Sequence, residues 1–299
     1  MEMLNFIWPW LAIWLAWVWV AIWQWILAKK AIEMMWKNPK EYVFYMVVAI
    51  LWLALVESAA IYWLIVSFQL LGSESIWLFS SIAAWLSIWL TGLWVWIWEW
   101  KLVAWALWAM ERNPKIKYNL LWFMVLFLAL IEVSAVYWLV ISFMIINSWI
   151  EHASFMWAWF AIWLAGLWVA VWRGYLTERS IEIMWANSKE MISYLAISIL
   201  WIALAETAAI YWIIVSFSIV QNDISLLLNS YAAIGAWVGI WIAWLWVWLW
   251  QGLIVAWAMT AINKAPEFKT KILSSMVLFV ALAETAAIYA LILAFNTIY

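Results

Sequence analysis

The chain has 299 residues, of which 72% are hydrophobic and only 10% are charged. Soluble domains keep about a quarter of their residues charged, so this composition excludes an ordinary soluble fold. A formal net charge of −2 argues against a nucleic-acid partner, and the absence of cysteine excludes disulfides and thiolate metal sites. The chain has no glycine-rich phosphate loop and no Ser/His/Asp set, and we therefore expect no enzymatic activity and no catalytic residue.

Long apolar segments follow one another along the chain, and each is long enough to cross a bilayer as a helix. Short polar turns separate them, and three of these turns contain a proline, which ends an incoming helix but fits the first turn of the next. We therefore predict an all-α membrane protein with eight transmembrane helices. They are expected at about 6–36, 41–71, 75–111, 116–147, 152–186, 190–221, 225–263 and 267–297.

One eight-residue motif, first seen as Leu-Val-Glu-Ser-Ala-Ala-Ile-Tyr at 55–62, occurs four times in all, once in each even-numbered segment. Its glutamates are 75, 74 and 78 residues apart, namely Glu57, Glu132, Glu206 and Glu284. A period of this length identifies one supersecondary unit repeated in tandem. We predict four antiparallel helical hairpins, standing side by side, with boundaries at 1–72, 73–148, 149–222 and 223–299.

Basic residues lie in or beside the turns within the hairpins, whereas the connectors between hairpins contain Glu74, Glu151 and Asp223 but no Lys or Arg. The positive-inside bias then makes the turns cytoplasmic and puts both termini outside. This predicts a multi-pass integral membrane protein whose first partner is the lipid bilayer.

Each repeated glutamate falls at mid-membrane depth, where a carboxylate costs several kcal/mol. One interpretation is structural: a protonated Glu that donates a hydrogen bond between helices. The other is functional: reversible binding of H⁺ or Na⁺, in which the cation neutralises the carboxylate. No other cofactor is expected.

A second polar residue lies 33 residues before each glutamate, on the partner helix, so the two reach similar depth in an antiparallel hairpin. In the first and fourth hairpins this residue is a Gln, which together with a nearby hydroxyl and Tyr provides oxygen ligands for a hard cation. The candidate metal ligands are Gln24, Glu57, Ser58 and Tyr62, and Gln251, Glu284, Thr285 and Tyr289.

The second and third hairpins depart from this pattern. Glu99 beside Glu132 favours a shared proton, because two close carboxylates resist joint ionisation. Arg173 beside Glu206 predicts a buried ion pair that needs no cation, although Glu99 would be an alternative partner for Arg173 if these hairpins are neighbours. Four equivalent ion sites are therefore not expected.

Together, the Glu-Ser/Thr-Ala-Ala-Ile-Tyr motif, the Asn-Pro turns at 38–39 and 113–114 and the upstream Gln resemble the proteolipid c subunit of rotary ATPases, called K in the sodium V-type enzymes. The resemblance implies a ring with first helices inside and second helices outside, in which the Glu carries H⁺ or Na⁺ past a stator. It implies a homo-oligomeric ring with stator and central-stalk subunits as partners. The Gln, Glu and Ser/Thr combination is similar to the sodium-binding version of the family.

The first helices depart from the family, which has an alternating glycine run where this chain has tryptophan. The chain contains 37 Trp and only 7 Gly, a composition that indicates an engineered sequence. At about 100° per residue, Trp10, Trp14, Trp17 and Trp25 form one flank of the first helix, and Trp8, Trp19 and Trp23 form another. We expect these flanks to contact neighbouring first helices and to widen the inner layer; the alternative is that they face lipid.

The leading functional hypothesis is thus a ring-forming rotor-type proteolipid with mid-membrane Glu sites for Na⁺ or H⁺. A designed transmembrane scaffold that assembles without moving ions is the alternative, favoured by Arg173, Glu99 and the missing glycines. A channel or transporter acting alone is weakest, because no polar stripe continues from Gln24 or Glu57 toward either membrane face.

Overall fold

A computed structural model describes residues 2–72, 78–147, 163, 169, 171, 173–185, 188–221 and 230–298. Within these ranges the secondary structure is entirely helical. The long helices are α1 (Glu2–Lys37), α2 (Tyr42–Gly72), α3 (Leu78–Arg112), α4 (Lys117–Ile146), α6 (Met191–Gln221), α8 (Ser230–Lys264) and α9 (Lys269–Ile298). A further helical segment covers 173–185.

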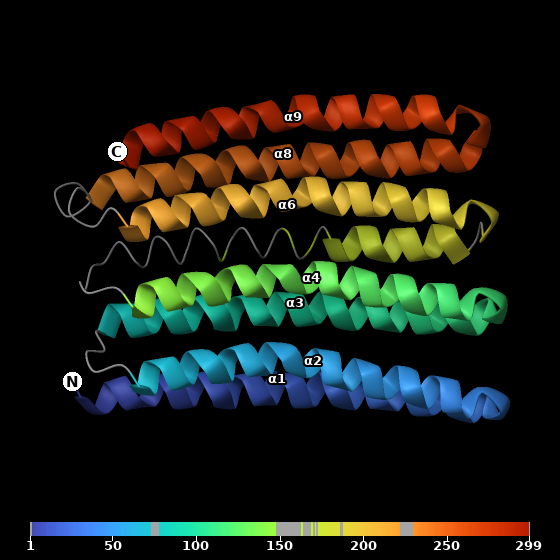
Figure 1. The fold of residues 1–299 in the computed structure, drawn as a ribbon, viewed down its shortest axis with the longest axis horizontal. Helices are drawn as coiled ribbons and strands as arrows, with labels where there is room; N and C mark the ends of the chain where they lie inside the picture. The colour runs from blue at the N-terminus through green and yellow to red at the C-terminus, as the bar shows by residue number, and fades with distance from the viewer. Residues whose placement is uncertain are drawn as a thin grey trace.

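The helices lie parallel to one another along the long axis of the molecule, and consecutive helices run in opposite directions (Figure 1). The most extensive contacts join α1 to α2, α3 to α4 and α8 to α9, so each of these pairs is an antiparallel hairpin. We number the hairpins 1 (α1 and α2), 2 (α3 and α4), 3 (segment 173–185 and α6) and 4 (α8 and α9). Both chain termini lie at one end and the turns within the hairpins at the other (Figure 1).

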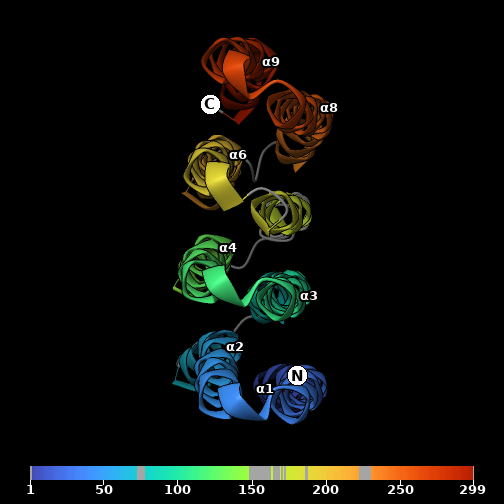
Figure 2. The ribbon, with the colours of Figure 1, turned by 90° about the vertical axis from the view of Figure 1, so that its right-hand side faces the viewer.

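Seen along the helix axes, the hairpins form a row two helices thick (Figure 2). The first helices α1, α3 and α8 make one layer, and the second helices α2, α4, α6 and α9 make the other (Figure 2). The row is nearly straight in this view. A side-by-side arrangement of hairpins, with first and second helices in separate layers, is therefore confirmed for the part of the chain that the structure describes.

The turns within the hairpins share one backbone pattern. In hairpin 1 the Asn38 N–H closes α1 by donating to the Met34 carbonyl at 3.0 Å, and the Glu41 N–H then donates to the Asn38 carbonyl at 2.9 Å. Pro39 begins a short 3₁₀ turn, Pro39–Glu41. The first residue of a helix has no intrahelical acceptor for its N–H, so a proline loses no hydrogen bond at this position. The turns Pro114–Ile116 and Pro266–Phe268 repeat this geometry, and Ser188–Glu190 takes the same place in hairpin 3.

Five described stretches are long and apolar enough to cross a membrane: Pro39–Gly72, Pro114–Ile146, Ser188–Gln221, Tyr231–Lys264 and Pro266–Ile298. Together with the hairpin pairing, they define an all-α, multi-pass integral membrane protein. Most of the helix expected at 152–186 lies outside the described residues, as do the connector residues Glu74, Glu151 and Asp223. The sidedness of the turns and termini therefore stays a prediction.

The buried apolar residues form two clusters along the helix axes. One lies toward the chain termini and includes Trp63, Trp96 and Trp138; the other lies toward the turns and includes Met34, Phe127 and Trp201. In α1 the boundary falls between Val20 and Leu27, which is the level of Gln24. The polar groups of the repeats therefore lie in a thin layer between two apolar layers.

Candidate functional site: a layer of carboxylates at mid-membrane depth

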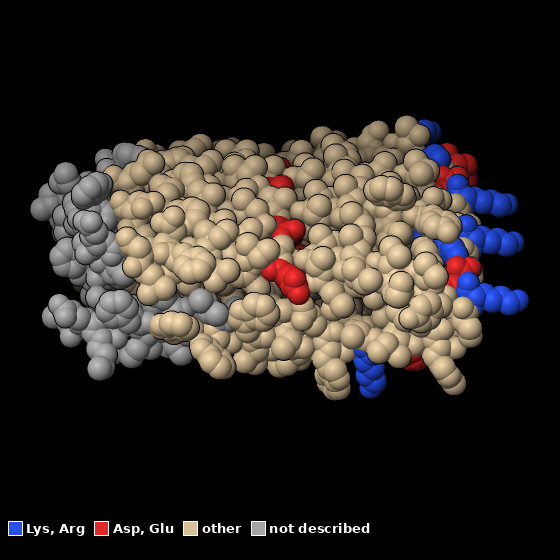
Figure 3. Space-filling view, turned by 60° about the horizontal axis from the view of Figure 1, so that its bottom comes forward, with Lys and Arg blue, Asp and Glu red and all other residues tan. Residues whose placement is uncertain are grey.

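Acidic side chains form a short row midway along the long axis, while most basic side chains visible on this face gather at one end (Figure 3). In an antiparallel hairpin each repeated glutamate and the residue 33 positions earlier reach a similar depth, which accounts for this common level. Each hairpin supplies one polar residue from its first helix and one Glu from its second, and four different local environments result.

In hairpin 1 the Gln24 side-chain amide donates a hydrogen bond to Glu57 Oε1 at 3.0 Å. The Ser58 hydroxyl donates to the Leu55 carbonyl of its own helix at 2.6 Å, which leaves its oxygen lone pairs available as ligands. Glu57 is exposed, because hairpin 1 stands at the end of the row. An amide, a carboxylate and a hydroxyl are thus present at this open edge.

Tyr62 does not join the Glu57 site, although it was expected among its ligands. Its hydroxyl donates instead to Glu132 Oε1 of hairpin 2 at 3.1 Å. The reason is helical geometry: Tyr62 follows Glu57 by five residues, which turns it about 140° around α2 from the Glu57 direction. Tyr211 likewise lies against Trp244 of the hairpin that follows it, with ring centroids 5.2 Å apart.

In hairpin 2 the Glu99 carboxyl is buried and interacts electrostatically with Glu132. Glu132 is half-buried and also receives the Tyr62 hydrogen bond. Two carboxyl groups this close in a membrane interior favour a state with at least one proton, since ionising both would bury two uncompensated like charges. That this pair shares a proton stays a prediction.

In hairpin 3 Arg173 forms an ion pair with Glu206, as the sequence predicted. The Arg173 guanidinium is fully buried, and its Nη1 also donates to the Leu130 carbonyl at 2.7 Å and the Ser134 hydroxyl at 3.0 Å in α4. The ion pair of Arg173 is therefore with Glu206 and not with Glu99, the alternative partner. Because the guanidinium already neutralises Glu206, this site has no need of a bound cation.

In hairpin 4 Gln251 is fully buried, and its Nε2 donates to the Val280 carbonyl, one turn before Glu284, at 3.3 Å. Its Oε1 is buried without a hydrogen-bond partner in the structure. The Thr285 hydroxyl donates to the Leu282 carbonyl at 2.7 Å, as Ser58 does in hairpin 1. Tyr289, expected among the ligands of Glu284, is instead 68% exposed at the other end of the row.

Sequence reasoning missed a second set of contacts between hairpins, near the turns. Lys117 of α4 pairs with Glu41 of hairpin 1, and Lys269 of α9 pairs with Glu190 of hairpin 3 at 2.9 Å. The two lysines stand 15 residues before the Glu of their own repeat, and the two acidic partners stand 16 residues before theirs. Aligning the repeats by their glutamates would have revealed this match of opposite charges.

Opposite charges also meet within α1 beside the turn. Lys37 contacts Glu33 at 2.7 Å, one helical turn away. The turn end of hairpin 1 therefore keeps its charges paired and solvated.

The tryptophans of the first helices pack between hairpins where a neighbour is present. Trp23 lies against Trp100 with ring centroids 5.0 Å apart, and Trp63 packs on Trp96 at 4.7 Å while donating to the Ile88 carbonyl at 2.9 Å. The Trp98 indole occupies the space that a side chain on Gly174 would need. These indoles contact neighbouring helices, whereas Trp10, Trp14, Trp17 and Trp25, which form one expected flank of α1, are exposed.

Two-helix units in a row, each with a carboxylate at the same membrane depth, define a multi-pass membrane proteolipid built from tandem hairpins. The family model of the c subunit of ATP synthase matches the chain twice, over residues 7–70 and 232–296, which are hairpins 1 and 4. Hairpins 1 and 4 are thus similar to the c subunit of ATP synthase. Neither curated proteins nor solved structures gave a match to the chain.

Proposed function

We propose that this chain is a ring-forming, rotor-type proteolipid whose mid-membrane carboxylates bind Na⁺ or H⁺. The observation that supports this most directly is the Gln24–Glu57 hydrogen bond of 3.0 Å at the open edge of the row, with Ser58 beside it. A neutral amide leaves the carboxylate charge available to a cation, and amide, carboxylate and hydroxyl oxygens are ligands of hard cations.

The four sites have different roles in this proposal. Glu57 and Glu284, each with a neutral Gln on the first helix, are the sites for Na⁺ or H⁺ exchange. Glu132 exchanges protons with Glu99 close by. Glu206 stays ionised and paired with Arg173, so one hairpin in each chain takes no cation. ATP hydrolysis, if it is coupled to such a ring, would belong to partner subunits docked on the basic turns, and stator and stalk subunits are the expected partners.

The second candidate is a designed transmembrane scaffold that assembles without moving ions. The Arg173–Glu206 pair is the observation that favours it, because a rotor must neutralise and release every carboxylate that passes its stator. The tryptophan content, which indicates engineering, agrees with this alternative.

Carbodiimide labelling separates the two functions, since the reagent modifies protonated carboxyl groups buried in a membrane. Under the rotor proposal, Glu57 and Glu284 react, and added Na⁺ or a rise in pH slows the reaction. Glu206 remains unmodified under all conditions and serves as the internal control. Labelling of Glu57 and Glu284 that ignores both Na⁺ and pH would refute ion exchange and leave the scaffold.

A further inference from the structure

The first helices carry charged residues much nearer to the carboxylate layer than the second helices do. In hairpin 3, Arg179 and Glu182 follow Arg173 by six and nine residues, which is about 9 and 14 Å along the helix axis. In the second helices, the charge nearest to a repeated Glu on the turn side is Lys271, 13 residues or about 20 Å before Glu284. The hydrocarbon of one leaflet is about 15 Å thick, so only the first-helix layer places charges inside it.

The two charges of hairpin 3 form an ion pair on the surface of segment 173–185. Arg179 Nη1 donates to Glu182 Oε2 at 2.6 Å, and both side chains are partly exposed. The same two repeat positions in α1 hold Lys30 and Glu33, whose charged atoms are 3.6 Å apart. An exposed pair of this kind is weak, so each member can exchange its partner for an opposite charge on a bound molecule.

A polar hollow of about 290 Å³ opens beside this pair, between segment 173–185 and α8. These two helices are neighbours in the first-helix layer (Figure 2). Tyr175 lies within hydrogen-bonding range of Arg179 on the wall that the segment provides. Thr260 and Asn263 of α8 provide the polar groups of the opposite wall.

The lining of the hollow presents both hydrogen-bond donors and acceptors. The Thr260 hydroxyl donates to the Ala256 carbonyl at 2.8 Å, so its oxygen can only accept from a ligand. Asn263 Oδ1 accepts from the Tyr194 hydroxyl at 3.4 Å, which leaves the Asn263 amide hydrogens to donate. A cation and an amide donor thus line the same hollow as a carboxylate and a hydroxyl acceptor.

An apolar groove of about 270 Å³ continues from this hollow toward the carboxylate layer. Tyr175 and Ala256 line both spaces, so the two adjoin. The other lining residues of the groove are Trp98, Val171, Gly252 and Leu253. Gly252 takes the repeat position of Trp100, whose indole packs against Trp23 between hairpins 1 and 2. The groove is therefore open between hairpins 3 and 4 where an indole stands between hairpins 1 and 2.

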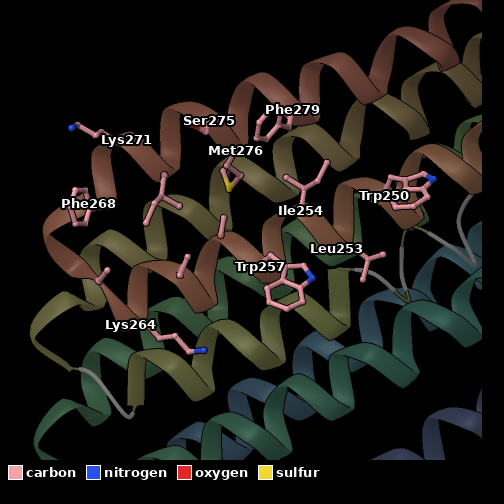
Figure 4. Close-up of a pocket in the computed structure, with 14 residues that line it drawn as sticks. Trp250, Leu253, Ile254, Trp257, Lys264, Phe268, Lys271, Ser275, Met276 and Phe279 are labelled. Carbon is pink, nitrogen blue, oxygen red and sulfur yellow. The ribbon is translucent and has the colours of Figure 1, made fainter.

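A larger hollow of the molecule lacks this combination of charges. It measures about 920 Å³ and lies between α8 and α9 (Figure 4). Among the described residues that line it, the charged groups are Lys264 and Lys271, and no carboxylate is present. Two cations beside an apolar wall do not select a molecule that carries both signs of charge.

We propose that the polar hollow and the apolar groove together bind one phospholipid with a primary ammonium headgroup, namely a phosphatidylethanolamine. Its phosphate accepts hydrogen bonds from Arg179 and the Asn263 amide. Its ammonium donates to Glu182 and to Thr260 Oγ1, and one acyl chain fills the groove as far as Gly252. Charge complementarity selects this occupant, because charge-assisted hydrogen bonds form at both ends of the headgroup. The inference goes beyond the proposed function and does not depend on it, since all of these residues belong to one chain.

Native mass spectrometry of the protein after lipid removal in detergent tests this proposal. Phosphatidylethanolamine, phosphatidylcholine and phosphatidylglycerol with identical acyl chains are titrated separately, and bound lipids are counted per chain of 35.3 kDa. Phosphatidylethanolamine is expected to bind once per chain, about tenfold more tightly than the other two, because choline has no N–H donor and glycerol has no charge. Equal affinities for the three lipids, or a preference for phosphatidylglycerol, would overturn the proposal.

Substitutions of the ion pair assign the selectivity to named groups. Glu182→Gln is expected to lower the affinity for phosphatidylethanolamine about tenfold and to leave that for phosphatidylcholine unchanged. Glu33→Gln, at the same repeat position in hairpin 1, is the matched control and keeps the preference, because Trp108 there replaces Thr260. Arg179→Gln weakens all three lipids, since all carry a phosphate. An unchanged circular dichroism spectrum shows that the variants are folded, and a preference that survives Glu182→Gln contradicts the assignment.

Phosphoethanolamine without acyl chains separates a lipid from a soluble ligand of the same headgroup chemistry. It is expected to leave the bound lipid in place at equal concentration, because it gains nothing from the apolar groove. Displacement of the lipid under these conditions would overturn the proposed occupant and make the hollow a site for a soluble phosphate ester.

Discussion

The Arg173–Glu206 pair is the most demanding electrostatic feature of the molecule, and substituting Glu206 by Gln tests it. The guanidinium is fully buried and also donates to the Leu130 carbonyl at 2.7 Å and the Ser134 hydroxyl at 3.0 Å. Glu206→Gln leaves it charged without a counter-ion. Removing one partner of a buried ion pair costs about 3–5 kcal/mol, and we expect a loss of that size in the free energy of unfolding.

The companion substitution Arg173→Gln has a smaller expected effect, because it reproduces the Gln24–Glu57 pair of hairpin 1. It removes two hydrogen bonds from a charged donor, worth about 1.5–3 kcal/mol each, but it leaves Glu206 able to take a proton and become neutral. Making both substitutions removes both charges. The double variant should therefore be more stable than Glu206→Gln alone, with a coupling energy of about 2 kcal/mol or more.

Unfolding in mixed micelles, with denaturing detergent as the variable and circular dichroism as the signal, measures these free energies. Glu57→Gln is the control: it removes the exposed carboxylate of an amide–carboxylate pair and should cost less than about 1 kcal/mol. Strictly additive effects of the two substitutions would refute the reasoning. So would a loss below about 1 kcal/mol for Glu206→Gln.

Two further substitutions probe the contacts between hairpins. Tyr62→Phe removes the 3.1 Å hydrogen bond to Glu132 and should accelerate carbodiimide labelling at that carboxyl group; an unchanged rate would contradict the contact. Gly174→Ala places a methyl group in the space of the Trp98 indole and should destabilise the fold by about 1–3 kcal/mol in the same unfolding assay. Gly239→Ala, where a methyl group meets nothing within 4 Å, is its control and should gain up to about 1 kcal/mol. Equal losses for the two alanine variants would count against the indole contact.

Hydropathy and the repeat period were enough to predict the architecture. Helix ends agree closely in hairpin 1, where 6–36 and 41–71 were expected and Glu2–Lys37 and Tyr42–Gly72 are observed. The prediction of such helices is reliable because a backbone in lipid must satisfy its own hydrogen bonds. An apolar run of this length therefore has few alternatives to a helix. The 33-residue spacing also identified the Arg173–Glu206 pair, because antiparallel helices of fixed rise bring those positions together.

Contacts between hairpins were harder to predict, because they depend on how far each helix is rotated about its axis. Placing Tyr62 near Glu57 assumed that five residues amount to one turn, whereas the extra residue turns it toward the next hairpin. The hydrogen bond from Arg173 to Ser134 could not be predicted from the repeat spacing, because it joins two different repeats and has no fixed sequence offset. The Lys269–Glu190 pair did have a signal, which emerges only when the repeats are aligned with one another.

The tryptophans act differently from one junction to the next, and this bears on the curvature of the row. Between α1 and α3 two indoles, Trp23 and Trp100, pack against one another with ring centroids 5.0 Å apart. At the next junction the equivalent indole, Trp98, packs directly onto Gly174, so the helices can approach closely. Large residues alone therefore do not set a uniform spacing of the inner layer.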